Sequence, residues 1–195
     1  MEANFYAMLS RMKYIERWAL MRNSRPENVS EHTLEVSILS HALAVIGNKR
    51  LGKKLNGERA ALIALFHDST EIITGDMPTP IKYHNGNIQG AFKEIEEEAA
   101  NRLLHMLPED FWEEYEPLYF QKEEDTYLWK LVKAADKLSA LIKCIQEEKA
   151  GNTEFANAKE SIIKSIEELD LEEAKIFIVD FLPSYYRNLD ELTQP

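Results

Sequence analysis

The sequence is poor in the residues that mark secreted, fibrous and membrane proteins. Its single cysteine, Cys144, cannot form an internal disulfide, which favours a reducing, cytoplasmic compartment. Only 7 glycines and 7 prolines occur among 195 residues, a composition that excludes collagen-like and low-complexity chains. The longest apolar run, AALIALF, has about seven residues against the ~20 of a membrane span, and the charged N-terminal segment has no signal-peptide core. We therefore expect a folded, cytoplasmic protein with no membrane partner.

Positive charge is also scarce. The chain has 23 lysines and arginines against 34 aspartates and glutamates, which gives a net charge of −11. This balance argues against nucleic acid and anionic membranes as partners, because no basic surface dominates the field. If the substrate is itself an anion, cationic side chains in the site must offset the overall repulsion.

Hydrophobic residues, 45% of the chain, recur at helical spacing in almost every segment. Asn28 and Glu31 form a capping-box pattern, and Gly47 and Gly75 are placed to end helices. Because no strand-period alternation or internal repeat stands out, we predict one all-α domain over residues 1–195, a helical bundle with loops at 19–28 and 75–90. The predicted helices cover residues 4–18, 29–47, 57–74, 91–107, 125–151, 154–170 and one or two segments within 172–192.

The segment LFHDSTEIITGD, residues 65–76, places a histidine and three carboxylates next to the most apolar stretch of the chain. At about 100° per residue, His67, Asp68 and Glu71 share one side of a helix, with Glu71 between the other two. Carboxylates beside an apolar wall are costly unless a cation offsets their desolvation. Taken alone the segment is a weak motif, because adjacent His and Asp are common by chance.

Two more polar residues point inward from other predicted helices. His32 falls on the apolar stripe of residues 29–47, and Asp136 has the small neighbours Ser139 and Ala140, which leave room near its carboxylate. A lone inward histidine is more often a hydrogen-bonded core residue than a ligand, but such residues recur here on three helices. The recurrence favours a divalent metal site, and two imidazoles with two carboxylates suit Mn²⁺, Co²⁺, Fe²⁺ or Zn²⁺. The four predicted ligands are His32, His67, Asp68 and Asp136.

Three segments, NVSEHT, HDSTEIITGDMPTPIKY and KAADKLSALIKC, occur in this order and resemble the HD-domain metal-dependent phosphohydrolases. The flanking IERWALMRNSRPENVSEH and FLPSYYRNLDEL resemble the bacterial 5′-deoxynucleotidases within that superfamily, so the resemblance covers essentially the whole chain. All four predicted ligands match the H…HD…D pattern, while Ser69 and Thr70 differ from the small residues expected there but keep the spacing. The resemblance implies an all-helical HD fold, a homodimer, and hydrolysis of deoxyribonucleoside 5′-monophosphates to deoxyribonucleoside and phosphate. It also implies that Asp68 contacts substrate and takes part in catalysis.

The resemblance also implies roles for residues near the ligands. Glu71 matches the acid/base residue that handles the proton of the attacking water or of the leaving 5′ oxygen. A second interpretation is that Glu71 orients His67. Arg17 matches the phosphate clamp, for which a bidentate guanidinium is suited. The residues alone do not rank Arg17 above its neighbours Arg22 and Arg25.

Trp18 and the loop Asp76-Met77-Pro78-Thr79 match the family's nucleotide-contacting residues. By this comparison Trp18 lies against the sugar, where its bulk excludes a 2′-hydroxyl. From the residues alone Trp18 would be core packing, and GDMPTP would be only a turn. The prolines preset the loop backbone, so Asp76 and Thr79 can hydrogen-bond the sugar at little ordering cost.

The remaining histidines, His41, His84 and His105, are isolated and form no second ligand pair. We interpret them as structural or surface residues. One metal ion is therefore expected, Co²⁺, Mn²⁺ or a similar ion, with Zn²⁺ as an alternative.

The sequence leaves the roles of two features open. Lys133 and Lys137 flank Asp136 and are either surface residues or cations that neutralise nearby carboxylates. The aromatic-rich terminus, residues 177–192, either closes the core or forms a dimer contact, and the core interpretation is favoured.

Three other functions compete with a 5′-deoxynucleotidase. Another HD phosphohydrolase, a cyclic-nucleotide phosphodiesterase or a nucleotide pyrophosphohydrolase, would use the same metal. A catalytically silent nucleotide-binding or regulatory module would keep the metal, but Glu71 and the apparent lack of an attached effector domain weigh against it. A purely structural helical protein would leave the four convergent polar residues unexplained.

Overall fold

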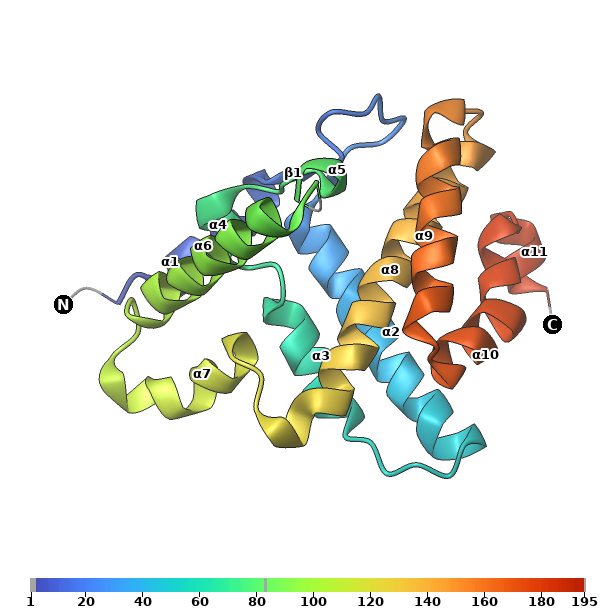
Figure 1. Cartoon of the computed structure of the whole chain (residues 1–195). Coiled ribbons are helices and arrows are strands. Elements are labelled where there is room, and N and C mark those ends of the chain that lie inside the picture. Colours follow the sequence, from blue (N-terminus) through green and yellow to red (C-terminus); the bar gives the residue numbers. More distant parts are fainter. Residues whose placement is uncertain (1–2, 83, 195) are drawn as a thin grey trace.

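The computed structural model describes residues 3–82 and 84–194, and most of them lie in helices (Figure 1). The central helices are α2 (Val29–Arg50), α3 (Gly57–Phe66) and α8 (Thr126–Lys149), which pack against one another. At one side lie α9 (Ala156–Leu169), α10 (Glu172–Asp180) and α11 (Leu189–Thr193), drawn in orange and red. At the other side lie α1 (Phe5–Leu9), α6 (Gly86–Leu104) and α7 (Trp112–Tyr119). The all-α prediction is confirmed.

The core lies where α2, α3 and α8 meet. Leu43 of α2, Ile63 of α3 and Leu138 of α8 are completely buried there. Apolar residues at helical spacing on all three helices thus face one another, which removes their surface from water. In the described ranges, no helix has the length and hydropathy that crossing a membrane requires.

Two of three predicted helix boundaries are confirmed. The Asn28 side chain accepts from the Glu31 amide at 3.0 Å and the Glu31 carboxylate accepts from the Asn28 amide at 3.4 Å, which makes the capping box that starts α2. Gly75, with φ +73°, ends α4 (Glu71–Thr74). The prediction that Gly47 ends its helix is wrong, because α2 continues to Arg50. Gly47 instead allows close packing, since a Cβ there would lie 2.7 Å from the carboxylate of Glu173 on α10.

The N-terminal helix predicted over residues 4–18 is wrong beyond residue 9. A 3₁₀ segment, Ser10–Tyr14, follows α1, and the chain then forms β1 (Glu16–Arg17). β1 pairs antiparallel with β2 (Glu27–Asn28), directly before α2, and the register places Arg17 opposite Glu27. Strands of two residues have no detectable period, so the sequence pattern could not reveal them.

The predictions for residues 57–90 also need correction. Residues 67–70 form a turn between α3 and α4, so the predicted continuous helix is interrupted. The predicted loop contains the short helix α5 (Thr79–Lys82), and α6 begins at Gly86. α7 lies in a segment for which the sequence predicted no element. The remaining 3₁₀ turns are Glu109–Phe111, Glu123–Asp125, Thr153–Phe155 and Leu182–Tyr186.

The C-terminal segment closes the core with its first half. Phe177 of α10 and Leu182 after it are buried, whereas Leu189 and Leu192 of α11 are exposed. The core interpretation of residues 177–192 therefore holds for the part before α11.

Candidate metal centre and active site

His32 lies in the first turn of α2, directly after the capping box at Asn28. The cap fixes where the helix begins, and helical spacing then turns His32 inward, where it is 1% exposed. Its Nε2 lies 3.2 Å from Oδ1 of Asp136 on α8 and 3.4 Å from Oδ2 of Asp68. The ring thus faces carboxylates from two distant parts of the chain.

His67 and Asp68 lie in the turn after α3, not on the continuous helix that the sequence predicted. The Nδ1 of His67 donates to the Ala64 carbonyl at 2.7 Å, since a carbonyl oxygen can only accept. The Nε2 of His67 lies 3.2 Å from Oδ2 of Asp68. Buried Ser69 holds the turn by donating its hydroxyl proton to the Phe66 carbonyl at 2.7 Å. His67 and Asp68 therefore lie close together, as predicted, but because of a turn and not because they share one face of a helix.

The potential ligand atoms of His32, His67 and Asp68 all lie within 4.8 Å of one another, and no second group of this kind occurs in residues 3–82 and 84–194. Asp136 joins them through its contact with His32. The Nε2 atoms of both histidines are buried and make no hydrogen bond. Unpaired imidazole nitrogens that face carboxylates are the ligands a divalent transition metal uses, so these residues fit such an ion.

Both carboxylates of this group are held in the ionised form. Burial alone would raise the pKa of Asp68, but the nearby imidazoles of His67 and His32 hold it well below its ordinary value. Burial would also raise the pKa of Asp136, but His32 and Lys137 lower it instead. The Nζ of Lys137 lies 3.1 Å from Oδ2 of Asp136, so this lysine has the neutralising role left open by the sequence.

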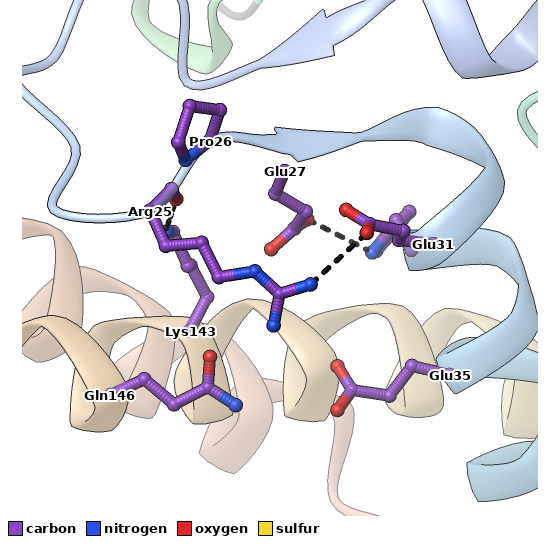
Figure 2. A pocket seen from close by; sticks show the side chains of 8 residues that line it. Arg25, Pro26, Glu27, Glu31, Glu35, Lys143 and Gln146 are labelled. Atoms are coloured by element: carbon purple, nitrogen blue, oxygen red, sulfur yellow. Dashed lines mark hydrogen bonds and ion pairs between the residues drawn. The ribbon is translucent and has the colours of Figure 1, made fainter.

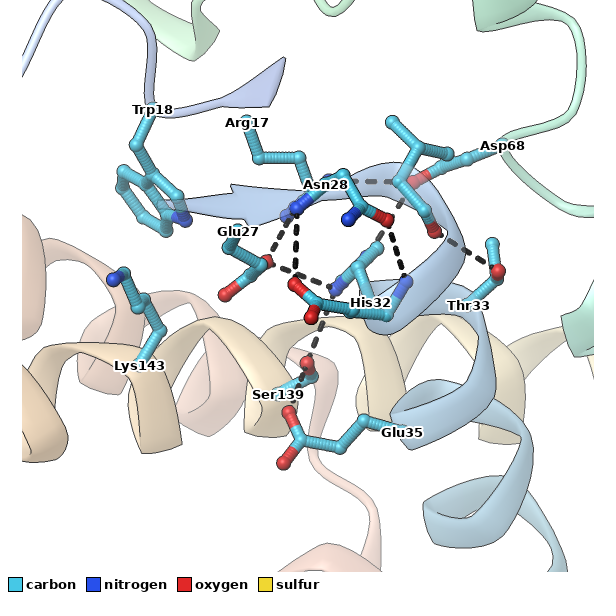
Figure 3. Close-up of polar contacts among 12 residues, drawn as sticks. Arg17, Trp18, Glu27, Asn28, His32, Thr33, Glu35, Asp68, Ser139 and Lys143 are labelled. Atoms are coloured by element: carbon cyan, nitrogen blue, oxygen red, sulfur yellow. Dashed lines mark hydrogen bonds and ion pairs between the residues drawn. The ribbon is translucent and has the colours of Figure 1, made fainter. Parts of the chain in front are cut away.

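Of the three arginines considered from the sequence, Arg17 is the one beside the potential metal ligands. Its Nη1 lies 3.4 Å from Oδ2 of Asp68, and its Nε donates to Glu27 at 2.8 Å (Figure 3). Burial would lower the pKa of Arg17, but the surrounding carboxylates raise it on balance, so the guanidinium stays charged. Arg22 and Arg25 are exposed. The structure thus ranks the three where the sequence could not.

Glu71 opens α4, three residues beyond Asp68. Its Oε2 is buried and has no hydrogen-bond partner. Burial, and next the charges of Asp68 and Asp76, raise the pKa of Glu71 to about 10. Arg17 and Lys82 oppose this rise, but at a pKa of about 10 the carboxyl group is still protonated at neutral pH in the metal-free protein. Such a group can donate a proton during a reaction.

Trp18 follows β1 and has φ +58°, a left-handed conformation that is uncommon for a bulky residue. The Asn23 amide donates to the Trp18 carbonyl at 3.2 Å, and the indole packs on Phe155 with ring centroids 5.3 Å apart. Figure 3 shows the indole over Lys143 and beside Glu27. The core-packing interpretation is therefore correct for one face of the ring.

The loop that matches nucleotide-contacting residues joins α4 to α5. Asp76 is close enough to Arg17 and Glu71 to influence the pKa of both. Asp76 is therefore the loop residue that the structure links to the site. The other three run from half-buried positions to the surface: Met77, Pro78 and Thr79.

A cavity of about 150 Å³ adjoins His32 between the start of α2 and α8 (Figure 2). Its lining is mostly charged and includes Glu27, Glu35 and Lys143. Trp18 does not line it, so the cavity is separate from the sugar contact that the resemblance implies.

Sequence reasoning missed three residues that support the site. Glu27 anchors Arg17, and Ser139 lies 3.0 Å from Nδ1 of His32 while donating to Glu35 at 2.6 Å. From the sequence, Ser139 was expected only as a small residue near Asp136. Glu35 is three positions after His32, so helical spacing could have found it. Glu27 depends on the two-residue ladder and had no such signal.

The other candidate polar residues lie away from the site. His41, His84 and His105 are exposed and none belongs to the group of potential ligands. Lys133 is exposed as well.

This helical arrangement is the fold of HD-domain phosphohydrolases. An HD-domain phosphohydrolase from Listeria innocua matches with a TM-score of 0.81 at 23% identity, over 95% of this chain and 90% of that one. The HD phosphohydrolase DatZ of cyanophage S-2L, described as bound to dA and one catalytic Zn²⁺, matches with a TM-score of 0.66 at 18% identity, over 93% of this chain and 96% of that one. At these identities the likeness defines the fold class.

Sequence comparison identifies the family within this class. The model for "5′-deoxynucleotidase YfbR-like" proteins matches residues 4–185. A 5′-deoxynucleotidase from Vibrio parahaemolyticus is 47% identical over 195 residues, which cover 98% of this chain and 99% of that protein. The chain belongs to the YfbR-like 5′-deoxynucleotidase family, and the resemblance carried by the three central segments is confirmed.

Proposed function

We propose that this protein is a metal-dependent 5′-deoxynucleotidase, which hydrolyses deoxyribonucleoside 5′-monophosphates to deoxyribonucleoside and phosphate. The observation that carries the proposal is the partly buried guanidinium of Arg17, 3.4 Å from Asp68 and beside the unpaired nitrogens of two histidines. In a chain with net charge −11, it supplies the local positive charge that a phosphate monoester requires. The activity for which the relatives are named and the dA bound to the cyanophage protein support the same substrate class.

Four residues would hold one divalent ion, Co²⁺, Mn²⁺ or Zn²⁺: His32, His67, Asp68 and Asp136. When bound there, such an ion polarises a phosphoryl oxygen and lowers the pKa of a water molecule. The Nδ1 atom of each histidine already contacts protein oxygen, which leaves Nε2 for the ion. The low pKa values of both carboxylates keep them ionised for the same purpose.

The chain's own residues then position the phosphate and move the proton. Arg17 binds the phosphate through its Nη atoms while Glu27 occupies its Nε. Asp68 contacts both the guanidinium and the histidines, so it joins the phosphate and metal subsites. Glu71 holds a proton at neutral pH and donates it to the leaving 5′ oxygen. The ionised Glu71 then accepts a proton from water, which restores the starting state.

Trp18 and the 76–79 loop would select the deoxyribose. The indole is fixed from behind by Phe155, so it cannot withdraw to admit a 2′-hydroxyl. Asp76, near Arg17 and Glu71, would hydrogen-bond the sugar. Three further loop residues would contact the nucleotide: Met77, Pro78 and Thr79.

Phosphate release from 5′-dAMP and 5′-AMP, with and without chelator and with added Co²⁺, Mn²⁺ or Zn²⁺, tests this function. Metal-dependent release from 5′-dAMP in clear preference to 5′-AMP is expected. Nucleoside triphosphates and cyclic nucleotides complete the panel. Pyrophosphate or a nucleoside monophosphate as the main product would instead identify another HD phosphohydrolase, and no turnover of any nucleotide would indicate a silent binding module.

A homodimer is the expected assembly, and exposed apolar residues support it. Leu34, Ile38 and Val45 lie along one face of α2, and Leu62 and Leu65 lie on the neighbouring α3. Exposed apolar residues gathered on two neighbouring helices are typical of an interface. Light scattering of the intact protein should give twice the chain mass, and Ile38→Glu should shift it to the monomer. A monomeric wild type would contradict the dimer.

We further infer a cytoplasmic location and one HD domain over residues 1–195. Buried, unpaired Cys144 suits a reducing compartment, and the family match over residues 4–185 supports one domain. Fractionation of the native host and limited proteolysis test the two points. Periplasmic recovery, or two separately stable fragments, would contradict them.

A further inference from the structure

The two histidines of the metal group are fixed by different means. The Nδ1 of His67 donates to a backbone carbonyl, Ala64 O, which no side-chain substitution removes. The Nδ1 of His32 instead lies 3.0 Å from the hydroxyl of Ser139, and that hydroxyl donates to Glu35 at 2.6 Å. Figure 3 shows His32, Ser139 and Glu35 in one line across the gap between α2 and α8. His32 is thus the histidine whose orientation depends on other side chains.

The direction of the hydrogen bonds in this line follows from a proton count. Glu35, when ionised, can only accept, so the single hydroxyl proton of Ser139 points to it. The Ser139 oxygen must then accept from Nδ1–H of His32. A neutral imidazole with its proton on Nδ1 has an unprotonated Nε2, which is the atom that faces Asp68 and Asp136. Burial raises the pKa of Glu35, and the Ser139 hydrogen bond opposes that rise, as expected of a bond to the ionised form.

Among the residues that the structure describes, no acceptor other than Ser139 is within hydrogen-bond distance of Nδ1 of His32. Oε1 of Glu27 lies 3.8 Å from Nδ1, which is too far for a hydrogen bond. That oxygen also accepts from Arg17 at 2.8 Å. Ser139 therefore links Nδ1 of His32 to the carboxylate of Glu35.

We propose that Ser139 and Glu35 are positioning residues for the metal: together they hold His32 with its proton on Nδ1 and its Nε2 directed at the ion. The arrangement also ties the two helices that supply ligands. Glu35 is three residues after His32 on α2, and Ser139 is three residues after Asp136 on α8, so each supporting residue lies one turn beyond a ligand. The inference rests on the metal ligands of the proposed function. It adds Ser139 and Glu35 as the residues that hold the ligand His32 in place.

The test measures Co²⁺ affinity by competition with a chelator for the wild type, Ser139→Ala, Glu35→Gln and a control, Ser37→Ala. Ser37 is a buried serine like Ser139, but it lies on α2 and donates to the Ala61 carbonyl on α3 at 2.9 Å, not to the Ser139–His32 line. We expect Co²⁺ to bind Ser139→Ala about tenfold to a hundredfold more weakly, as is typical when a partner of a ligating histidine is lost. Glu35→Gln keeps an acceptor oxygen but no charge, so its loss should be smaller, about threefold to tenfold. Ser37→Ala should bind Co²⁺ like the wild type.

A second measurement, by NMR, detects the Nδ1 proton of His32 directly. In the Zn²⁺-loaded wild type, the Nδ1–H of His32 should give a slowly exchanging ¹⁵N-coupled proton resonance. It should be lost in Ser139→Ala and exchange faster in Glu35→Gln. Wild-type Co²⁺ affinity and an unchanged resonance in both variants would overturn the inference, as would equal weakening by Ser37→Ala. If Ser139→Ala does not fold, Glu35→Gln decides by the same two measurements. A wild type that binds no Co²⁺ would refute the metal centre itself, and this result is distinct from a failure of the inference about Ser139 and Glu35.

Discussion

The Nε of Arg17 donates to Glu27 at 2.8 Å across an antiparallel ladder of two residues, while Nη1 of the same guanidinium reaches Asp68 at 3.4 Å. The ladder therefore fixes the cation that the proposed phosphate site requires. Glu27 restrains the side chain from one end, and the other end remains directed at the metal group. A flexible arginine in the same place would lose more side-chain entropy when it binds phosphate.

Removing the anchor tests this relationship. Glu27→Ala should lower kcat/KM for 5′-dAMP by roughly tenfold, or about 1.4 kcal/mol, because Arg17 must then be ordered by the substrate. Glu16→Ala is a matched control, since Glu16 is the other residue of β1 but is exposed. Steady-state kinetics of both variants provide the measurement. Equal kcat/KM for Glu27→Ala and the wild type would contradict the role of the ladder.

Glu71 should be needed for turnover but not for metal binding. Glu71→Ala removes the proton donor, so kcat should fall by about 10²–10⁴-fold. Co²⁺ affinity should stay close to that of the wild type, because Glu71 is not one of the four proposed ligands. If the variant loses affinity for Co²⁺ in parallel with activity, Glu71 belongs to the support of His67 and not to proton transfer.

The raised pKa of Glu71 also predicts a pH dependence of stability in the metal-free protein. Its folded-state pKa of about 10 lies far above the ordinary glutamate pKa of 4.5, so between these values the native state holds a proton that the unfolded chain has lost. Stability contributed by this group therefore falls as pH rises through that range. The glutamine of Glu71→Gln does not titrate. In the presence of chelator, the Tm of this variant should therefore rise relative to the Tm of the wild type as pH increases from 5.5 to 8.5.

The same Tm comparison needs an exposed glutamate as a control. Glu94 is exposed on α6, and Glu94→Gln should show a constant Tm difference from the wild type across the two pH values. A Tm difference between Glu71→Gln and the wild type that stays constant from pH 5.5 to pH 8.5 would show that Glu71 is ionised in the metal-free native state over that range.

Trp18 should set the preference for deoxyribose. Trp18→Ala opens the space beside the sugar, so the ratio of kcat/KM for 5′-dAMP over 5′-AMP should fall by roughly tenfold to a hundredfold. Trp129→Phe is the comparison, since Trp129 is a partly buried tryptophan packed against the core on α8. A Trp18→Ala enzyme that still rejects 5′-AMP as the wild type does would remove Trp18 from substrate selection.

A buried ion pair fastens the loop that carries Trp18. Lys143 pairs with Glu147 and also donates to the Arg25 carbonyl at 2.6 Å, while Glu147 accepts from the Ser24 amide at 2.8 Å. Lys143→Met leaves Glu147 buried without its cation, so the free energy of unfolding should drop by about 3–5 kcal/mol. Lys175→Met, which breaks two exposed ion pairs, should leave the free energy of unfolding nearly unchanged. Denaturant unfolding at pH 7 measures both.

Acid should remove the contribution of this pair. Burial would raise the pKa of Glu147, but Lys143 and then Asn152 and Ser24 lower it on balance to about 2. Its stabilisation is therefore complete above pH 4.5 and is lost as pH falls from about 4.5 to about 2. The difference in unfolding free energy between wild type and Glu147→Gln should shrink over that range. A constant difference would show that the charge of Glu147 is not involved.

The sequence was most informative where periodicity and side-chain chemistry agree. The inward direction of His32 followed from the apolar stripe of α2 and its cap, and both depend only on residues close in sequence. The grouping of His67 with Asp68 was also predicted, but from an assumed continuous helix. The turn at residues 67–70 is held by contacts such as that of Ser69 with Phe66, which helical periodicity does not encode.

Features that depend on contacts between distant segments were not visible in the sequence. The Arg17–Glu27 ladder joins residues ten positions apart without any strand pattern. Ranking Arg17 over Arg25 also required the structure, because both arginines lie near the same loop. The raised pKa of Glu71 depends on burial and on neighbours that only the fold brings together.

The most direct test of the metal centre is anomalous diffraction at the cobalt edge from crystals of the wild type grown with Co²⁺. We expect one strong peak within about 2.0–2.3 Å of His32 Nε2, His67 Nε2, Asp68 and Asp136. A peak located elsewhere, or no peak while His32 and Asp136 stay apart, would contradict this expectation.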